Sequence, residues 1–144
     1  MMTIGDFDET QRQTIAALLN TVVPPSTDGR MPGAGALDFL RYLSEETADF
    51  APSLLRVLDA LPADFAAAEA AVQTAAVETF AARNPELFDA LLFRIYACYY
   101  QNDVVRRLIG SQPGAPFPRG NTIPAGDLST LEAVRMRGAG YRRL

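Results

Sequence analysis

The sequence predicts an all-α protein, a compact bundle of five or six helices followed by an extended C-terminal arm with a short helix. Three observations lead to this prediction. Apolar residues recur at intervals of three and four through most of residues 9–109, the period of helices with one buried face. The alternation of apolar and polar residues that marks half-buried strands is absent. Within residues 110–126, 8 of 17 residues are Gly or Pro, a composition typical of extended chain.

We expect residues 1–109 to form the helical body and residues 110–144 to form the arm, within one domain overall. A chain of this length can bury about 70% of the surface that its unfolded form exposes.

The first helix is marked at both ends. Asp8 is a plausible N-cap, and Gln11 stands three residues later, as a capping box requires. Pro24 and Pro25 stop the helix because neither has an N–H to donate. Its expected buried face comprises Ile15, Leu18, Leu19 and Val22. Residues 26–35 then form a loop.

Two shorter helices follow. The first runs from about residue 36 to 42, with either Leu37, Leu40 and Leu43 or Phe39 and Tyr42 facing inward. The second covers residues 49–61, has Pro52 in its first turn and breaks at Pro62. Its apolar stripe comprises Leu54, Leu55, Leu58 and Leu61.

Residues 63–82 hold ten Ala in twenty positions and predict one continuous helix. Phe65, Val72 and Phe80 are the large apolar residues within it.

An aromatic helix begins at Asn84 as N-cap and Pro85 as first helical residue. Phe93, Cys98 and Tyr100 lie off its main stripe, so the helix is apolar nearly all round. It is therefore either central or covered on its outer side by another chain. The main stripe comprises Leu87, Phe88, Leu91, Leu92, Ile95, Tyr96 and Tyr99.

Two short helices complete the chain. Asn102 or Asp103 caps one that ends near residue 109. Ser129 and Glu132 have capping-box spacing and open another that ends near residue 137, before two glycines.

The residue types exclude several kinds of active site. The chain has no His, and all 13 basic residues are Arg, so it lacks an imidazole base, a Ser-His-Asp triad and a Schiff-base lysine. Cys98, the one Cys, is interpreted as a small buried hydrophobe. The carboxylate pairs Glu45–Glu46 and Asp59/Asp64 are interpreted as solvated surface charge. We therefore predict no catalytic, cofactor-binding or metal-binding residue in this chain.

Three glycines at positions 29, 33 and 35 loosely resemble a phosphate-binding loop. They follow a helix, whereas the dinucleotide fingerprint needs strand–turn–helix order, so we interpret them as an ordinary loop.

Charge is distributed unevenly. Residues 1–103 carry 15 acidic residues and 6 Arg, whereas residues 104–144 carry 7 Arg and 2 acidic residues. Either the two segments neutralise each other, or the basic segment meets a separate acidic partner. Nucleic acid is not expected as a partner, because the whole chain is acidic and no known binding motif is present.

Aromatic and Arg side chains are favoured at protein interfaces. The three tyrosines of the aromatic helix either contact a partner or, in the alternative interpretation, two of them belong to the core. The arm either wraps around a partner or docks on the acidic body of its own chain. The candidate interface residues are Tyr96, Tyr99, Tyr100, Phe117, Arg119, Arg135, Arg137, Tyr141, Arg142 and Arg143.

No membrane span is expected, because no apolar stretch approaches the ~20 residues needed. Residues 1–10 are acidic and lack the features of a signal peptide. The sequence as it stands predicts a cytoplasmic protein, or a periplasmic one if a signal was removed or the partner carries it.

Three segments in order resemble one family. They are TIAALLNTVVPPSTDG, then MPGAGALDFLRYL, then YACYYQNDVVRRLIG followed by PFPRGN. Together they resemble the gluconate 2-dehydrogenase subunit 3 family, over about residues 10 to 125. These are small helical subunits that accompany flavin-dependent sugar and alcohol dehydrogenases of the glucose–methanol–choline (GMC) oxidoreductase type.

The resemblance implies an all-α accessory subunit without its own active site. The implied partner is a large FAD-binding catalytic subunit that oxidises a sugar, sugar acid or glycoside, and FAD is expected there. A cytochrome c subunit is common in the family, which makes it a candidate electron acceptor. In the family the small subunit is held to aid folding, stability or export, and many members carry a twin-arginine signal that is not seen here.

Two other classes stay open. One is a free-standing helical protein-binding or scaffold module without a flavoprotein partner. The other is a small enzyme that uses carboxylates or tyrosine, with Glu45, Glu46 and Tyr99 as the groups to test.

Overall fold

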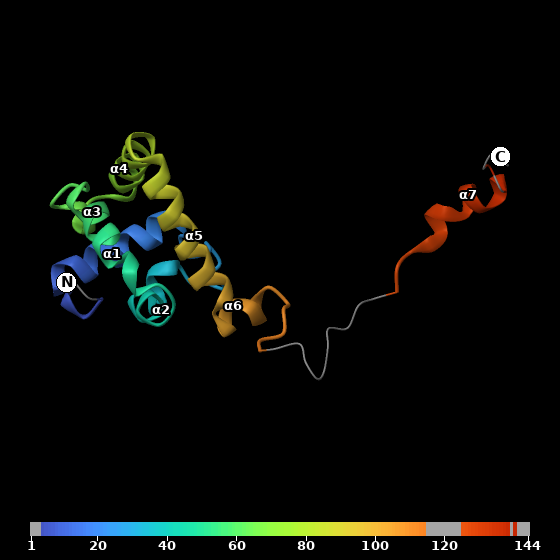
Figure 1. Cartoon of the computed structure of the whole chain (residues 1–144), viewed down its shortest axis with the longest axis horizontal. Coiled ribbons are helices and arrows are strands. Elements are labelled where there is room, and N and C mark those ends of the chain that lie inside the picture. The colour runs from blue at the N-terminus through green and yellow to red at the C-terminus, as the bar shows by residue number, and fades with distance from the viewer. Residues whose placement is uncertain (1–3, 115–124, 139, 141–144) are drawn as a thin grey trace. The chain divides into compact units, whose positions relative to one another are not determined.

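The computed structural model describes residues 4–114, 125–138 and 140 (Figure 1). It divides into two units, Met1–Pro113 and Gly114–Leu144. All regular structure in the described residues is helical, which confirms the predicted all-α class.

The first unit contains the helical bundle. Its α-helices are α1 (Glu9–Val22), α2 (Phe39–Glu46), α3 (Ala51–Asp59), α4 (Ala70–Arg83), α5 (Pro85–Gln101) and α6 (Asp103–Leu108). Its short 3₁₀ helices are η1 (Ile4–Asp6), η2 (Ala34–Ala36), η3 (Ala48–Phe50) and η4 (Phe65–Ala67). In the second unit, η5 (Leu128–Leu131) leads into α7 (Glu132–Arg137).

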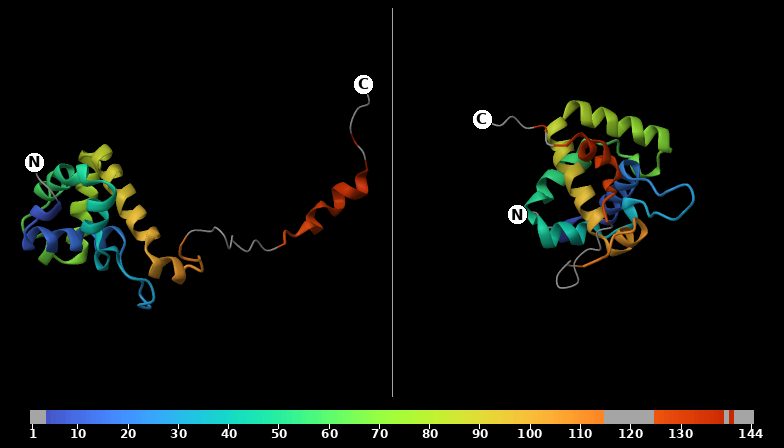
Figure 2. Two further views of the ribbon diagram at one scale, coloured as in Figure 1. Left: turned by 60° about the horizontal axis from the view of Figure 1, so that its bottom comes forward. Right: turned by 90° about the vertical axis from the view of Figure 1, so that its right-hand side faces the viewer.

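Helices α1 and α5 organise the core. Helix α1 packs against η2, η4, α3 and α4, while α5 packs against α2, α3, α4 and α6 (Figures 1 and 2). Nearly all the core side chains are apolar, and no buried side-chain polar atom among the described residues lacks a hydrogen-bond partner. The largest fully buried side chains are Phe65, Leu18, Leu43, Leu54, Leu91, Ile95, Val57 and Val105.

The predicted start of α1 is confirmed. The Gln11 N–H donates to Asp8 Oδ1 at 2.8 Å, and the Asp8 N–H donates to Gln11 Oε1 at 2.9 Å, which completes the capping box. The helix ends at Val22, just before the two prolines. Ile15, Leu18 and Leu19 are buried, whereas Val22 is half-buried.

The second predicted helix is shifted toward the C-terminus. Asp38 caps α2 by accepting from the Arg41 N–H at 3.1 Å, so the helix starts at Phe39 and continues to Glu46. Phe39 and Leu43 are its buried residues, so one residue from each predicted set faces inward. The shift arises because the side chain of Asp38 caps the helix, which sets its first residue at Phe39.

The expectation of one helix across residues 63–82 is wrong. Ala68 and Glu69 adopt extended backbone, with ψ of 156° and 152°, and separate η4 from α4. Phe65 is buried in the core, and the Gln73 amide donates to the Phe65 carbonyl at 2.9 Å. Burial of Phe65 therefore outweighs the helix propensity of the neighbouring alanines.

The helix predicted over residues 49–61 is η3 followed directly by α3, and it ends at Asp59, two residues before the predicted end. Pro52 lies in the first turn of α3, as predicted. Leu54, Leu58 and Leu61 are buried, and Val57 is buried although it lies outside the predicted stripe.

Of the two caps predicted for the last helices, one is confirmed and the other is wrong. Asn102 caps α6 by accepting from the N–H groups of Val104 and Val105 at 2.9 and 3.3 Å. The predicted Ser129–Glu132 capping box does not form. Asp127 accepts from the Ser129 N–H at 2.9 Å and opens η5, and α7 follows without a side-chain cap.

The glycine-rich loop before α2 packs against α1. The Gly35 N–H donates to Asn20 Oδ1 at 3.0 Å, and a Cβ at Gly35 would collide with the Ala16 carbonyl and lie 2.6 Å from Asn20 Nδ2. A Cβ at Gly33 would collide with Asn20 Oδ1. These glycines therefore permit close packing, in accord with the loop interpretation.

Candidate functional site

Helix α5 is held by one face. It starts with Pro85 at its first position, and Leu91, Ile95 and Tyr99 on its inner side are buried. Leu87, Phe88 and Cys98 are half-buried against the same core. Three turns of the helix are thereby fixed to the bundle.

The opposite side of α5 exposes three aromatic rings. Phe93, Tyr96 and Tyr100 are 71%, 43% and 54% exposed. They stand at positions i, i+3 and i+7, so they share one face of the helix, which we call the aromatic face. Monomeric proteins seldom leave large apolar side chains grouped on the surface without a binding role.

The aromatic face is supported from the core. The rings of Tyr99 and Tyr100 meet edge to face with centroids 5.3 Å apart, and those of Tyr96 and Tyr100 are 6.2 Å apart. Because Tyr99 is buried, its ring restricts the position of Tyr100. A partner that binds here would lose less side-chain freedom than on a surface of isolated rings.

Tyr99 itself belongs to the core. Only 4% of it is exposed, and its hydroxyl donates to the Pro32 carbonyl at 2.8 Å. Burial raises its pKa. We therefore leave Tyr99 out of the candidate surface, and of the three tyrosines only this one is core, not two as the alternative interpretation held.

Arg94 stabilises the position of α5, a role that sequence analysis did not identify. Its guanidinium lies 4.0 Å from the centroid of the Phe50 ring in η3. It also donates to Thr47 Oγ1 at 3.1 Å and to the Ala90 carbonyl at 2.9 Å. The contact joins residues 44 positions apart in sequence, and no local pattern predicts such a pairing.

Helix α6 also exposes apolar side chains. Val104 and Leu108, together with Ile109 just beyond the helix, are 53%, 41% and 53% exposed. Val105 anchors the helix in the core.

In the second unit, the apolar residues of η5 and α7 are all exposed. They are Leu128, Leu131, Val134 and Met136. Arg135 donates to Glu132 Oε1 at 2.9 Å, an exposed ion pair within the helix, and Arg137 is exposed. The other arm candidates, Phe117, Arg119, Tyr141, Arg142 and Arg143, lie outside the described residues.

Cys98 is part of α5 and borders a hollow of about 330 Å³ between α5 and α2, which Asp38 and Tyr42 also line. Burial, and secondarily the negative charge of Asp38, raise the pKa of the thiol to about 11. The thiol is therefore protonated near neutral pH, which disfavours nucleophilic attack. The guanidinium of Arg94, one turn before Cys98 on α5, contacts the Phe50 ring.

The carboxylate pairs are solvent-exposed. Glu45 accepts from Arg41 Nε at 2.8 Å in a surface ion pair, while Glu46, Asp59 and Asp64 are exposed. Among the residues that the structure describes, no group of three or more His, Cys, Asp or Glu could hold a metal ion.

Helices long and apolar enough to cross a bilayer are also absent from the described part of the chain. Comparisons with models of protein families, with curated proteins and with solved structures found no match.

Proposed function

We propose that this chain is a non-catalytic small subunit that binds and stabilises, or assists the folding of, an FAD-dependent large subunit of the GMC type. The large subunit would act on a sugar, sugar acid or glycoside. The observation that carries the binding role is the aromatic face of α5, in which Phe93, Tyr96 and Tyr100 are exposed on one side of a firmly packed helix.

The kind of partner rests on the family resemblance, and the structure is compatible with it. The proline pair that ends α1, the glycine loop packed on Asn20, and Tyr99 bonded to Pro32 all fall within the three segments of that resemblance. Pro24, Pro25 and Asn20 are exposed, whereas Tyr99 is a core residue whose hydrogen bond to Pro32 joins α5 to the glycine loop. The resembling segments would thus preserve the framework that presents the aromatic face.

FAD would belong to the large subunit. In this chain the space beside Gly33 and Gly35, the nearest approach to a phosphate-binding loop, is filled by Asn20. The chain would act through mass action: binding to the folded large subunit, and not to its unfolded form, raises the stability of the folded form. A cytochrome c as electron acceptor would likewise belong to the rest of the complex.

Coexpression tests the proposal. A neighbouring GMC-type large subunit would be produced with and without this chain, and its soluble yield, flavin absorbance and melting temperature would be measured. We expect all three to rise with the small subunit present. Equal values in both preparations would contradict the proposal.

The second candidate function is a free-standing helical binding or scaffold module. The exposed apolar residues of the second unit favour binding by more than one surface, and they say nothing about flavin. Purification of the chain from its source cell separates the two candidates. A yellow protein that copurifies supports the subunit, whereas a colourless partner supports the scaffold.

A further inference from the structure

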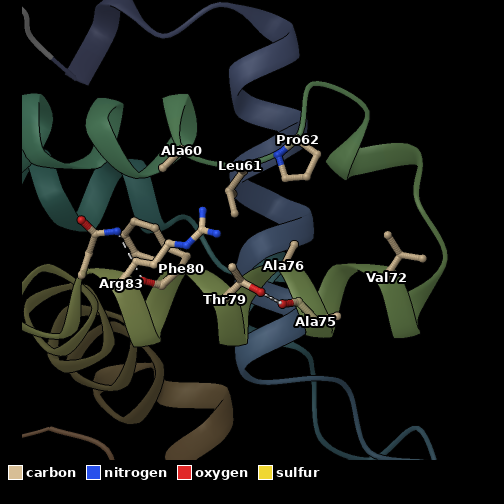
Figure 3. A pocket seen from close by; sticks show the side chains of 10 residues that line it. Ala60, Leu61, Pro62, Val72, Ala75, Ala76, Thr79, Phe80 and Arg83 are labelled. Carbon is tan, nitrogen blue, oxygen red and sulfur yellow. Dashed lines mark hydrogen bonds between the residues drawn. The ribbon is translucent and has the colours of Figure 1, made fainter.

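A groove of about 730 Å³ lies between α4 and the turn that follows α3. Leu61 and Pro62 form one side, and Ala75, Ala76 and Thr79 of α4 form the other. Figure 3 shows these side chains facing one another across the groove, with the guanidinium of Arg83 extending into it.

The length of the groove along α4 corresponds to a short helix. Val72 and Arg83, its end residues on α4, are separated by about 16 Å of helix rise, or roughly three turns. Three of the α4 side chains between them that line the groove, Ala75, Ala76 and Thr79, are small, which permits close approach of a second helix. Leu61 and Phe80 beneath it are core residues, so its floor is rigid and apolar.

The polar groups of the groove are satisfied, with one exception. The Thr79 hydroxyl donates to the Ala75 carbonyl at 2.8 Å, and the Asn84 amide donates to the Phe80 carbonyl at 3.4 Å. Arg83 makes no hydrogen bond through its side chain and no ion pair with the described residues. It is the only charged residue among those that line the groove.

The position of Arg83 in the last turn of α4 is favourable for the helix dipole by itself. The Arg83 side chain is solvent-exposed at the end of the groove, so its charge is available to a bound partner. A groove with apolar residues along its length, and with one cation at its end that has no partner among the described residues, is complementary to an apolar segment that carries a carboxylate, and it would repel a basic one.

We propose that this groove binds an amphipathic helix of a partner protein, about three turns long, whose apolar face lies on Ala75 and Ala76 and whose carboxylate pairs with Arg83. Helix-in-groove recognition uses apolar anchors at i, i+3, i+4 and i+7. The acidic residue belongs in the first turn of the bound helix, because an antiparallel arrangement then pairs opposite dipole ends. The inference goes beyond the proposed function, since it concerns α4 and does not depend on a flavoprotein.

Two synthetic peptides test the groove. Each has about twelve residues, leucines at i, i+3, i+4 and i+7, and a hydrocarbon staple on its outer face. One has Glu in the first turn and the other has Gln there. Titration of the isotope-labelled full chain should shift the amide resonances of Ala75, Ala76 and Thr79. We expect the Glu peptide to bind about threefold more tightly than the Gln peptide, the scale of a solvent-accessible ion pair.

Paired variants locate the interaction. Arg83→Gln should remove the preference for Glu, whereas Arg56→Gln, a similar change in the last turn of α3, should keep it. Ala75→Trp should fill the groove and weaken binding about tenfold or more. Ala71→Trp, at an exposed α4 position outside the groove, should have little effect. The amide spectrum of each free variant verifies its fold.

Several results would overturn the proposal. They are no saturable binding at millimolar peptide, shifts confined to the aromatic face of α5, and equal affinity of the two peptides for the wild-type chain. A concentration-dependent dimer that Ala75→Trp abolishes would assign the groove to a second copy of this chain instead.

Discussion

At the scale of single residues, Gly35 allows the backbone before α2 to pack directly against α1, a contact that composition alone does not reveal. Gly35 lies where α1 meets the segment before α2. A Cβ at this position would collide with the Ala16 carbonyl, so only glycine fits without a rearrangement. Asn20 then bonds the Gly35 N–H. Because this contact is so close, a larger residue at position 35 should destabilise the fold.

We expect Gly35→Ala to destabilise the protein by about 1–3 kcal/mol, the usual cost of an added group in a packed region. Urea denaturation followed by circular dichroism measures this. Gly126→Ala is the control, because a Cβ there meets nothing within 4 Å. If both variants unfold at the same urea concentration, the packing role of Gly35 is refuted.

The raised pKa of the Cys98 thiol should make the stability of the protein depend on pH in the alkaline range. Burial raises its pKa from the ordinary 9.0 to about 11, so the unfolded chain loses this proton at lower pH than the folded chain does. The protonated thiol therefore contributes stability that is complete below pH 9 and is lost as the pH rises toward 11. The chain has no Lys and no His, so few other groups titrate in this range.

The difference in unfolding free energy between the wild type and Cys98→Ala should fall steadily from pH 8.5 to pH 10.5. Urea titrations at matched pH measure it, and the contributions of the tyrosines cancel except for that of Tyr42, whose pKa Cys98 also raises. A difference that stays constant or grows across this interval would contradict the burial of the thiol.

At the scale of elements, α5 serves two purposes with two faces. Its inner face is buried in the bundle, and its aromatic face exposes Phe93, Tyr96 and Tyr100, of which Tyr100 contacts the buried ring of Tyr99. Arg94 fixes the helix laterally through Phe50 and Thr47. A firmly held helix with an exposed aromatic face is suited to binding with little rearrangement.

Replacing Phe93, Tyr96 and Tyr100 together by Gln should weaken binding to the large subunit at least about tenfold, because aromatic residues commonly dominate interfaces. The melting temperature of the isolated chain should change little, since these residues are exposed. Biosensor titration and thermal denaturation provide the two readings.

The matched control is the triple change of Ala71, Thr74 and Glu78 to Gln on the exposed side of α4. It should leave the affinity for the large subunit unaltered. Similar losses in both triple variants would show that the aromatic face has no special role.

At the scale of the whole molecule, charge is divided along the chain. The net charge is −9 over residues 1–103 and +5 over residues 104–144. Arg135 and Arg137 are exposed, and within the part of the chain that the structure describes Arg135 pairs with Glu132 while Arg137 has no ion-pair partner. Such a basic segment favours association with an acidic surface, and added salt weakens that association.

Replacing Arg135, Arg137, Arg142 and Arg143 by Gln should therefore weaken the complex several-fold and reduce its sensitivity to salt. The control set, Arg12, Arg30, Arg41 and Arg56, removes the same charge from residues 1–103. Affinity measured at low and high salt compares the two sets. A larger loss in the control set would refute the role of the arm.

Local signals predicted much of this fold. The all-α class follows from periodicity, and the ends of α1, α5 and α6 follow from Asp8, Pro24, Pro85 and Asn102, whose effects act within a turn of the helix. The break at Ala68–Glu69 could not be predicted, because it depends on the burial of Phe65 against distant residues.

Periodicity and composition are enough to predict a helical chain without His or Lys, in which α5 is apolar nearly all round. Which side of α5 is buried follows from its packing in the bundle, which places Tyr99 in the core and Tyr96 and Tyr100 at the surface. It also brought the turn after α3 against α4 to form the groove that Arg83 enters. The physical reason is that periodicity specifies a face, whereas burial of that face requires neighbours that long-range packing alone supplies.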